Sequence, residues 1–175
     1  MRKVILFIAM SLDGYIADSH GKVDWLSGQG CEEEEDTYTA FTEGIDIVLM
    51  GWNTYDQIVS ELSPSEWVYE KFHTYVITHK KKESTEQIQF TSENPVQLLE
   101  KLKAEEGKDI WICGGANLIY QLMDAGMIDR YYISVIPTIL GKGIRLFGTF
   151  EKEQKLVLKR TGSYDGIVEL VYENR

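Results

Sequence analysis

The chain has 175 residues, of which 43% are hydrophobic and 26% charged, and its formal net charge is −10. This size and composition are typical of one globular domain, so we expect residues 1–175 to form a single domain. The acidic excess disfavours nucleic acid as a partner, because binding a phosphate backbone requires clustered Lys and Arg. The apolar run Val4–Met10 is too short to span a membrane and lacks a cleavage pattern. We therefore expect a cytoplasmic protein without a membrane partner.

Several apolar runs predict strands, and their continuous character indicates strands that are covered on both faces. In chain order these runs are 4–10, 45–50, 74–78, 110–113 and 130–136. Two further strand-like runs, 155–161 and 167–173, are joined through Asp165-Gly166. Because Asp-Gly is a common hairpin turn, we expect these two runs to form an antiparallel hairpin.

Helical patterns fill gaps between the strands, at 31–43, 53–59, 94–107 and 117–125. In the third pattern Asn94 suits the helix N-cap and Pro95 the first helical position, and Gly107 suits the C-terminal end. The first begins with the acidic run 32–36, which favours a helix N-terminus. Strands alternating with helices predict a three-layer α/β domain with a mixed sheet.

Two strand-to-helix junctions contain glycine. Gly114 and Gly115 follow the fourth strand, and their lack of Cβ atoms lets the main chain approach a ligand. The helix that follows presents backbone N–H groups, which suit a phosphate. Gly51 ends an earlier strand and precedes Asn53 and Thr54, so two such corners together suit a dinucleotide diphosphate. The alternative is that both are turns that only pack and that Asn53 and Thr54 only cap a helix.

Cysteine and histidine spacing predicts no metal site. Cys31 and Cys113 lie far apart, and no Cys/His cluster has zinc spacing. Cys113 lies in an apolar run, which is typical of a small buried hydrophobe.

Four segments in order carry a family resemblance: 8–17, 50–55, 112–120 and 129–143. On these segments the chain resembles the dihydrofolate reductase-like fold, and most of all the reductase-domain family of bacterial riboflavin biosynthesis. The resemblance implies an α/β/α fold with a central mixed sheet, mostly parallel and closed by the hairpin. Because the zinc signature of a deaminase is absent, we expect a stand-alone relative. We also expect a homodimer, with the strand at Tyr131-Tyr132 or the hairpin as the dimer face.

The resemblance implies a reduced nicotinamide dinucleotide, NADPH or alternatively NADH, that reduces a small heterocyclic or ribosylamino-pyrimidine-type substrate. It implies that the nicotinamide lies near Ala9, Ile16 and Ala17. It implies that the diphosphate lies near Gly51, Trp52, Asn53, Thr54, Gly114, Gly115, Ala116, Asn117, Leu118 and Ile119. It implies that Thr78, His79 and Lys80 flank the adenosine.

The chain departs from the family at Trp52, where the family has an arginine that pairs with the 2′-phosphate. An indole has one N–H donor and no charge, although it can stack on adenine. The positive charge would then come from His79, Lys80 and Lys81, whose alternative role is that of a solvated loop.

Asp13 is the candidate catalytic residue. By analogy with the family it would orient a substrate hydroxyl, or donate a proton if burial raised its pKa. Its alternative role is a tight Asp-Gly turn. Trp25 and Tyr120 are further candidates for substrate contact, with core packing as their alternative. Because no carboxylate directly follows Trp25, a pterin substrate is disfavoured, and a catalytically silent dinucleotide-binding or regulatory protein is the second hypothesis.

Overall fold

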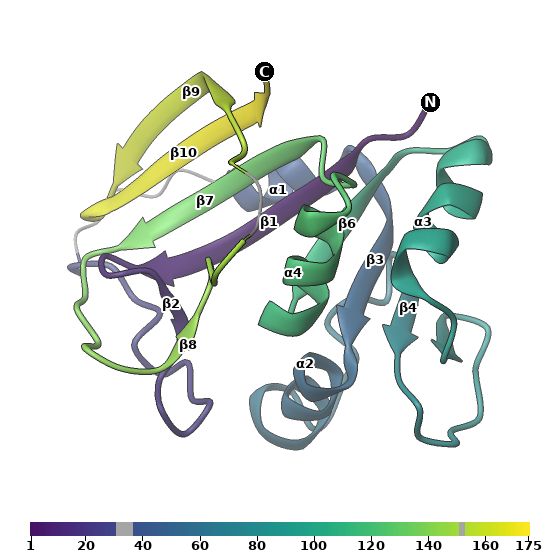
Figure 1. Cartoon of the computed structure of the whole chain (residues 1–175). Helices are drawn as coiled ribbons and strands as arrows, with labels where there is room; N and C mark the ends of the chain where they lie inside the picture. The colour runs from purple at the N-terminus through teal and green to yellow at the C-terminus, as the bar shows by residue number, and fades with distance from the viewer. Residues whose placement is uncertain (31–36, 151–152) are drawn as a thin grey trace.

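The structure, a computed structural model, describes residues 1–30, 37–150 and 153–175 (Figure 1). Within these ranges eight strands form one sheet in the order β5-β4-β3-β6-β1-β7-β10-β9. The strands of this sheet are β1 (Val4–Ser11), β3 (Ile45–Gly51), β4 (His73–Ile77), β5 (Ile88–Thr91), β6 (Asp109–Gly114), β7 (Arg130–Ile136), β9 (Leu156–Tyr164) and β10 (Ile167–Asn174). Two short strands, β2 (Tyr15–Ala17) and β8 (Ile144–Arg145), pair separately.

The sheet is mixed, as predicted. The six strands from β5 to β7 pair in parallel, whereas β10 pairs antiparallel with both β7 and β9. The carboxyl ends of the parallel strands therefore lie along one edge, with the corners after β3 and β6 next to each other. Ligands of open α/β sheets bind at this edge.

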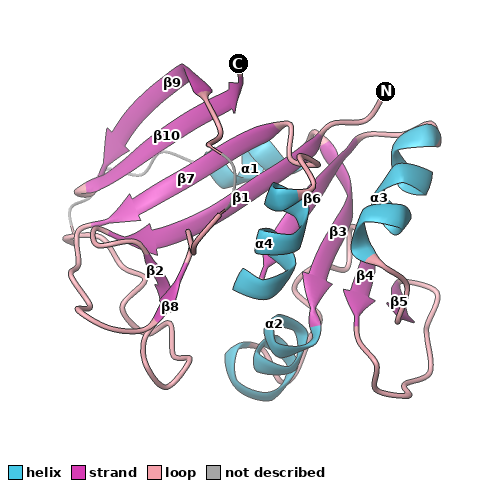
Figure 2. Ribbon diagram, in the orientation of Figure 1, coloured by secondary structure: helices cyan, strands magenta, loops and turns pink. Residues whose placement is uncertain are grey.

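Helices cover both faces of the sheet and create the three predicted layers (Figure 2). On one face α3 (Pro95–Ala104) and α4 (Ala116–Asp124) pack on Val4 and Leu6 of β1. On the other face α1 (Thr37–Thr42), α2 (Trp52–Gln57) and the π-helix η1 (Ile58–Leu62) pack on Ile5. Successive residues of β1 thus enter opposite cores, because side chains alternate along a strand.

The helix predicted from Asn94 is confirmed, and Asn94 Oδ1 accepts the backbone N–H groups of Val96 and Gln97 at 3.0 and 3.3 Å. The helix predicted over 31–43 is described only from Thr37, and its acidic run lies outside the described residues.

The structure adds elements that the apolar runs do not predict, namely β2, β5, β8 and η1. Tyr131 is 2% exposed and β7 lies between β1 and β10, so β7 has no free strand edge at which a second copy could pair. The homodimer itself stays a prediction. None of the described helices combines the length and apolar character needed to cross a bilayer.

Candidate functional site

The two glycine corners predicted from the sequence lie side by side. Met50 of β3 is in register with Gly114 of β6. A Cβ atom on Gly51 would lie 3.8 Å from the backbone nitrogen of Gly115, and one on Gly115 would lie 3.3 Å from Thr54 Oγ1. The first distance is an ordinary van der Waals contact, whereas the second is a tight one, so Gly115 is the position at which a Cβ atom would crowd the corner.

The diglycine corner leads directly into α4. Gly114 has a φ of +129°, a conformation that favours glycine. No side chain caps the first turn of α4 after Gly115. Its first backbone N–H groups therefore remain available to a ligand, and the helix dipole favours an anionic one.

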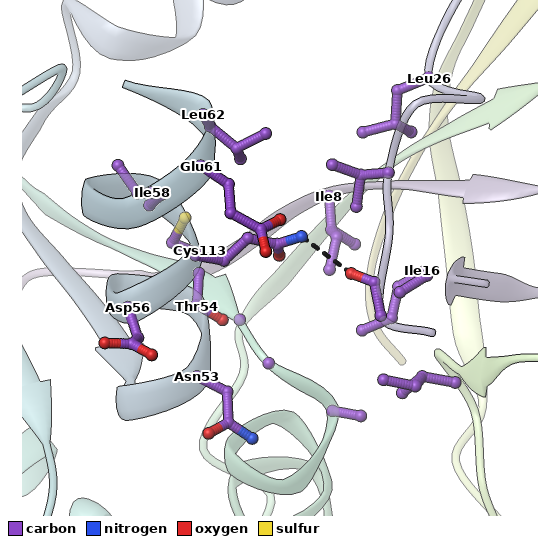
Figure 3. Close-up of a pocket in the computed structure, with 18 of the residues that line it drawn as sticks. Ile8, Ile16, Leu26, Asn53, Thr54, Asp56, Ile58, Glu61, Leu62 and Cys113 are labelled. Carbon is purple, nitrogen blue, oxygen red and sulfur yellow. Dashed lines mark hydrogen bonds between the residues drawn. The ribbon is translucent and has the colours of Figure 1, made fainter. Parts of the chain in front are cut away.

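These corners form one end of a cleft with a volume of about 750 Å³. One wall comes from β1, β2 and the loop that follows β2, the other from α2 and η1, and the corner between β6 and α4 closes the cleft between them (Figure 3). The structure brings ten of the predicted site residues together in the lining: Ala9, Ile16, Ala17, Asn53, Thr54, Gly114, Gly115, Ala116, Asn117 and Tyr120.

The remaining predicted residues do not line the cleft. They are Asp13, Trp25, Gly51, Trp52, Thr78, His79, Lys80, Leu118 and Ile119. Leu118 and Ile119 are 5% and 0% exposed in the core under α4. Because these side chains point into the protein, the predicted cofactor contact at these two positions would have to come from the main chain. The backbone N–H of Ile119 is also engaged, since it donates to the Gly115 carbonyl at 3.1 Å.

Trp52 is the centre of a basic and aromatic cluster beyond the carboxyl ends of β3 and β4. The Lys80 ammonium lies 4.1 Å from the centre of the indole ring, and the Lys82 ammonium lies 5.3 Å from it. Lys82 also lies 4.8 Å from the ring of Tyr55. Thr78 positions this loop, because its Oγ1 accepts the backbone N–H of Lys80 at 3.0 Å. Sequence reasoning did not select Lys82, although it ends the basic run that begins at Lys80.

Asp13 holds a turn instead of facing the cleft. Its carboxylate accepts the Ser11 hydroxyl at 2.6 Å and the backbone N–H groups of Leu140 and Gly141 at 3.1 and 2.7 Å. These hydrogen bonds, that of Ser11 first, lower the pKa of Asp13 to about 2. The condition for proton donation, a raised pKa, is therefore not met.

The loop after β2 contacts the opposite wall of the cleft. Gln57 Nε2 donates to the Gly21 carbonyl at 2.8 Å, and Lys22 Nζ lies 2.8 Å from Glu61 Oε2. The Lys22 ammonium lowers the pKa of Glu61, chiefly by donating this hydrogen bond. Trp25 lies outside the lining and donates its Nε1–H to the Lys22 carbonyl at 3.2 Å.

Cys113 and Tyr69 lie together in the lining. Tyr69 Oη and Cys113 Sγ are 3.5 Å apart, and burial raises the pKa of the Cys113 thiol to about 11. The thiol is thus protonated at neutral pH and unreactive as a nucleophile. Tyr120 donates its hydroxyl to the Arg145 carbonyl, and burial raises its pKa.

Sequence reasoning missed other lining residues, most of which come from the turn after β2 and from α2 and η1, with Tyr69 from the segment before β4 and Ile144 from β8. They are His20, Gly21, Val23, Leu26, Asp56, Gln57, Ile58, Ser60, Glu61, Leu62, Tyr69 and Ile144. The spacing of Gln57 and Glu61, four residues apart, was a usable signal, since such residues share a helix face.

Comparison with known proteins assigns the chain to a family. Residues 2–171 match the RibD C-terminal domain. The chain belongs to the RibD C-terminal domain family. This bears out the resemblance on which the cofactor and substrate expectations rest, and it assigns the chain a reductase fold.

Relatives of this RibD C-terminal domain protein include two from Bacillus subtilis. The uncharacterized protein YwjB is 38% identical over 98% of this chain and 97% of its own, and the uncharacterized protein YyaP is 31% identical over 98% and 94%. The riboflavin biosynthesis protein RibD of Haemophilus influenzae is 24% identical over 81% of this chain, which spans 49% of that protein.

Solved structures show the same fold. A putative riboflavin biosynthesis protein from Shewanella sp. PV-4 superposes with a TM-score of 0.87, 28% identity and 99% coverage of both chains. A deaminase/5-amino-6-(5-phosphoribosylamino)uracil reductase from Thermotoga maritima superposes with a TM-score of 0.71 and 16% identity, over 99% of this chain and 57% of its own.

Proposed function

We propose that this protein is a reductase that uses NADPH, with NADH as the alternative, to transfer hydride to a small heterocyclic or ribosylamino-pyrimidine-type substrate. The observation that carries the proposal is the diglycine corner before α4, which opens into a cleft of about 750 Å³. The family supports it, since the Thermotoga maritima protein with this fold is named a reductase.

The residues present fit a dinucleotide. The corner offers main-chain N–H donors at α4 and the side chains of Asn53, Thr54 and Asn117. A Cβ atom on Gly115 would occupy part of the space between this residue and Thr54, since it would lie 3.3 Å from Thr54 Oγ1. Small and apolar residues, Ala9 among them, line the adjoining wall and suit a planar ring. When bound, the reduced nicotinamide supplies the hydride, and the protein supplies orientation and exclusion of water.

The 2′-phosphate of NADPH would meet Lys80 and Lys82 at the Trp52 cluster. Both ammonium groups lie over the indole, at 4.1 and 5.3 Å from its centre, so the cluster carries the charge that Trp52 itself lacks. A cation held over an aromatic face is partly desolvated and attracts an anion that stacks beside it. This arrangement favours NADPH over NADH.

A silent dinucleotide-binding or regulatory protein is the second candidate, and Asp13 is the observation that favours it. The pKa of Asp13 is lowered to about 2 and its carboxylate is occupied by the 138–143 loop, so the predicted proton donor is ionised at neutral pH. Reduction would then take its proton from water or from another lining group.

The experiment that separates these candidates measures binding and turnover on the same protein. Calorimetry with NADPH and NADH tests binding, and the loss of reduced-nicotinamide absorbance with a panel of imines, aldehydes and ketones tests turnover. Binding with turnover supports the reductase. Tight binding without turnover on any compound supports the silent module, and no binding of either dinucleotide contradicts both.

A further inference from the structure

We infer that the substrate end of this cleft accepts a small, uncharged and largely apolar carbonyl compound, and that it rejects a phosphorylated sugar. The inference rests on the proposed function, because it concerns the part of the cleft that a bound dinucleotide would leave open. It replaces the ribosylamino-pyrimidine part of the proposed substrate class by small, uncharged carbonyl compounds, and it sets this chain apart from an enzyme that must hold a phosphoribosyl group.

The cleft has two chemically different ends (Figure 3). Asn53 and Thr54 lie at the end formed by the glycine corner, where polar donors gather. Leu26 and Leu62 lie at the opposite end, on opposite walls. A ligand that extends from the corner therefore meets two leucine side chains at its far end.

The two leucines are exposed although they are large apolar side chains. Leu26 is 43% exposed and Leu62 is 54% exposed, and both line the cleft with Val23 and Ile58. Apolar side chains that line a cavity and remain open to water gain free energy when an apolar ligand covers them. A hydrated sugar phosphate offers no such contact.

This end offers a phosphate no cationic partner. Among the described residues no Lys or Arg lines the cleft. Lys22 Nζ lies 2.8 Å from Glu61 Oε2, so the charges of this pair offset each other, and Asp56 lies at the other end of the cleft beside Asn53 (Figure 3). A phosphate placed here would lose water without gaining an arginine or lysine partner.

His20 also lines the cleft. Its backbone N–H donates to Asp18 Oδ1 at 2.7 Å, so an anion brought near His20 would also meet the Asp18 carboxylate.

The corresponding reaction is balanced with the dinucleotide as reductant. The carbonyl carbon of the substrate accepts the hydride, the carbon–oxygen π bond becomes a single bond, and the oxygen takes one proton from water. The products are the alcohol, the oxidised dinucleotide and the hydroxide ion left by the water.

The test compares two probes on protein saturated with the oxidised dinucleotide, so that binding is read without turnover. Benzaldehyde represents the neutral apolar carbonyl class, and ribose phosphate represents the phosphorylated sugar class. Calorimetry should show benzaldehyde binding roughly tenfold more tightly than ribose phosphate. Replacement Leu62→Lys or Leu26→Lys adds a cation and removes apolar contact. Either replacement should reduce the ratio of benzaldehyde affinity to ribose phosphate affinity by about fivefold or more.

Leu158→Lys is the matched control. Leu158 is 51% exposed on the edge strand β9 and does not line the cleft, so its replacement adds the same charge elsewhere. It should leave both probe affinities unchanged, and all variants should keep the affinity for NADPH. Retained NADPH affinity also shows that the leucine variants fold.

Ribose phosphate binding as tightly as benzaldehyde, or an unchanged ratio in both leucine variants, would overturn the inference. Saturable NADPH binding with no affinity for benzaldehyde would overturn it as well. Failure of NADPH itself to bind the unmodified protein is a separate result, because it contradicts the proposed function.

Discussion

Thr54 Oγ1 lies 3.3 Å from the position that a Cβ atom would take on Gly115. This relationship joins two strand-to-helix corners that are more than fifty residues apart in the sequence. A Cβ atom on Gly115 would press against the Thr54 side chain, and a larger side chain there would extend into the space that we propose for the diphosphate.

Replacement Gly115→Val should lower the affinity for NADPH by about tenfold or more, which is ~1.4 kcal/mol. Its added methyl groups would occupy the space between Thr54 and the first turn of α4, while the φ of Gly115, −88°, is one that valine adopts. Calorimetry measures the affinity. Gly44→Ala is the control, because a Cβ on Gly44 meets only the Phe41 carbonyl at 3.5 Å and lies outside the cleft. A folded Gly115→Val protein with undiminished affinity would count against the site.

Replacement of Lys80 and Lys82 by alanine should reduce the affinity for NADPH by about tenfold and leave that for NADH nearly unchanged. Both ammonium groups lie over Trp52, where we propose that the 2′-phosphate binds. The loss should shrink at high salt, because ions screen exposed charges. Lys71→Ala, which removes a charge before the amino end of β4, should change neither affinity. Equal losses of affinity for NADPH and NADH would show that the 2′-phosphate does not bind at Lys80 and Lys82.

Asp13→Asn should change stability at acidic pH while leaving turnover in place. The pKa of Asp13 is lowered from 3.8 to about 2 by the Ser11 hydroxyl and the backbone N–H groups of Leu140 and Gly141. A lowered folded-state pKa means that the stabilisation is present above about pH 4 and is lost as the pH falls toward 2. Urea unfolding across that range should show a shallower pH dependence in the variant than in the unmodified protein.

Turnover gives the second readout for Asp13. If the residue only positions the 138–143 loop, Asp13→Asn should keep most of the activity and the same pH profile above about pH 5. Complete loss of turnover with intact NADPH binding would show that Asp13 touches the substrate after all.

Much of the fold was predictable because buried strands have continuous apolar sequences and helix ends have characteristic capping residues. The run Val4–Met10 is apolar throughout since β1 is covered on both faces, and Asn94-Pro95 specifies where α3 begins. The strand β5 was not predictable in the same way, because its alternating polar residues break the apolar run. The pair β2–β8 depends on a contact between distant segments.

The site was predictable only where backbone geometry demands a residue type. Gly114 must tolerate a φ of +129°, and that need is visible as a diglycine in the sequence. The position of Lys82 over Trp52 and the contact of Gln57 with Gly21 arise from chain folding and have no local signature. Asp13 has a local signature that is ambiguous, because an Asp-Gly pair is equally compatible with a catalytic role and with a tight turn.

The most direct test is a crystal structure of the protein with NADPH bound. The account predicts diphosphate oxygens within hydrogen-bonding distance of backbone N–H groups at Gly115 and the first turn of α4, and the nicotinamide against Ala9. A dinucleotide bound elsewhere, with the Thr54 side chain filling the corner, would contradict it.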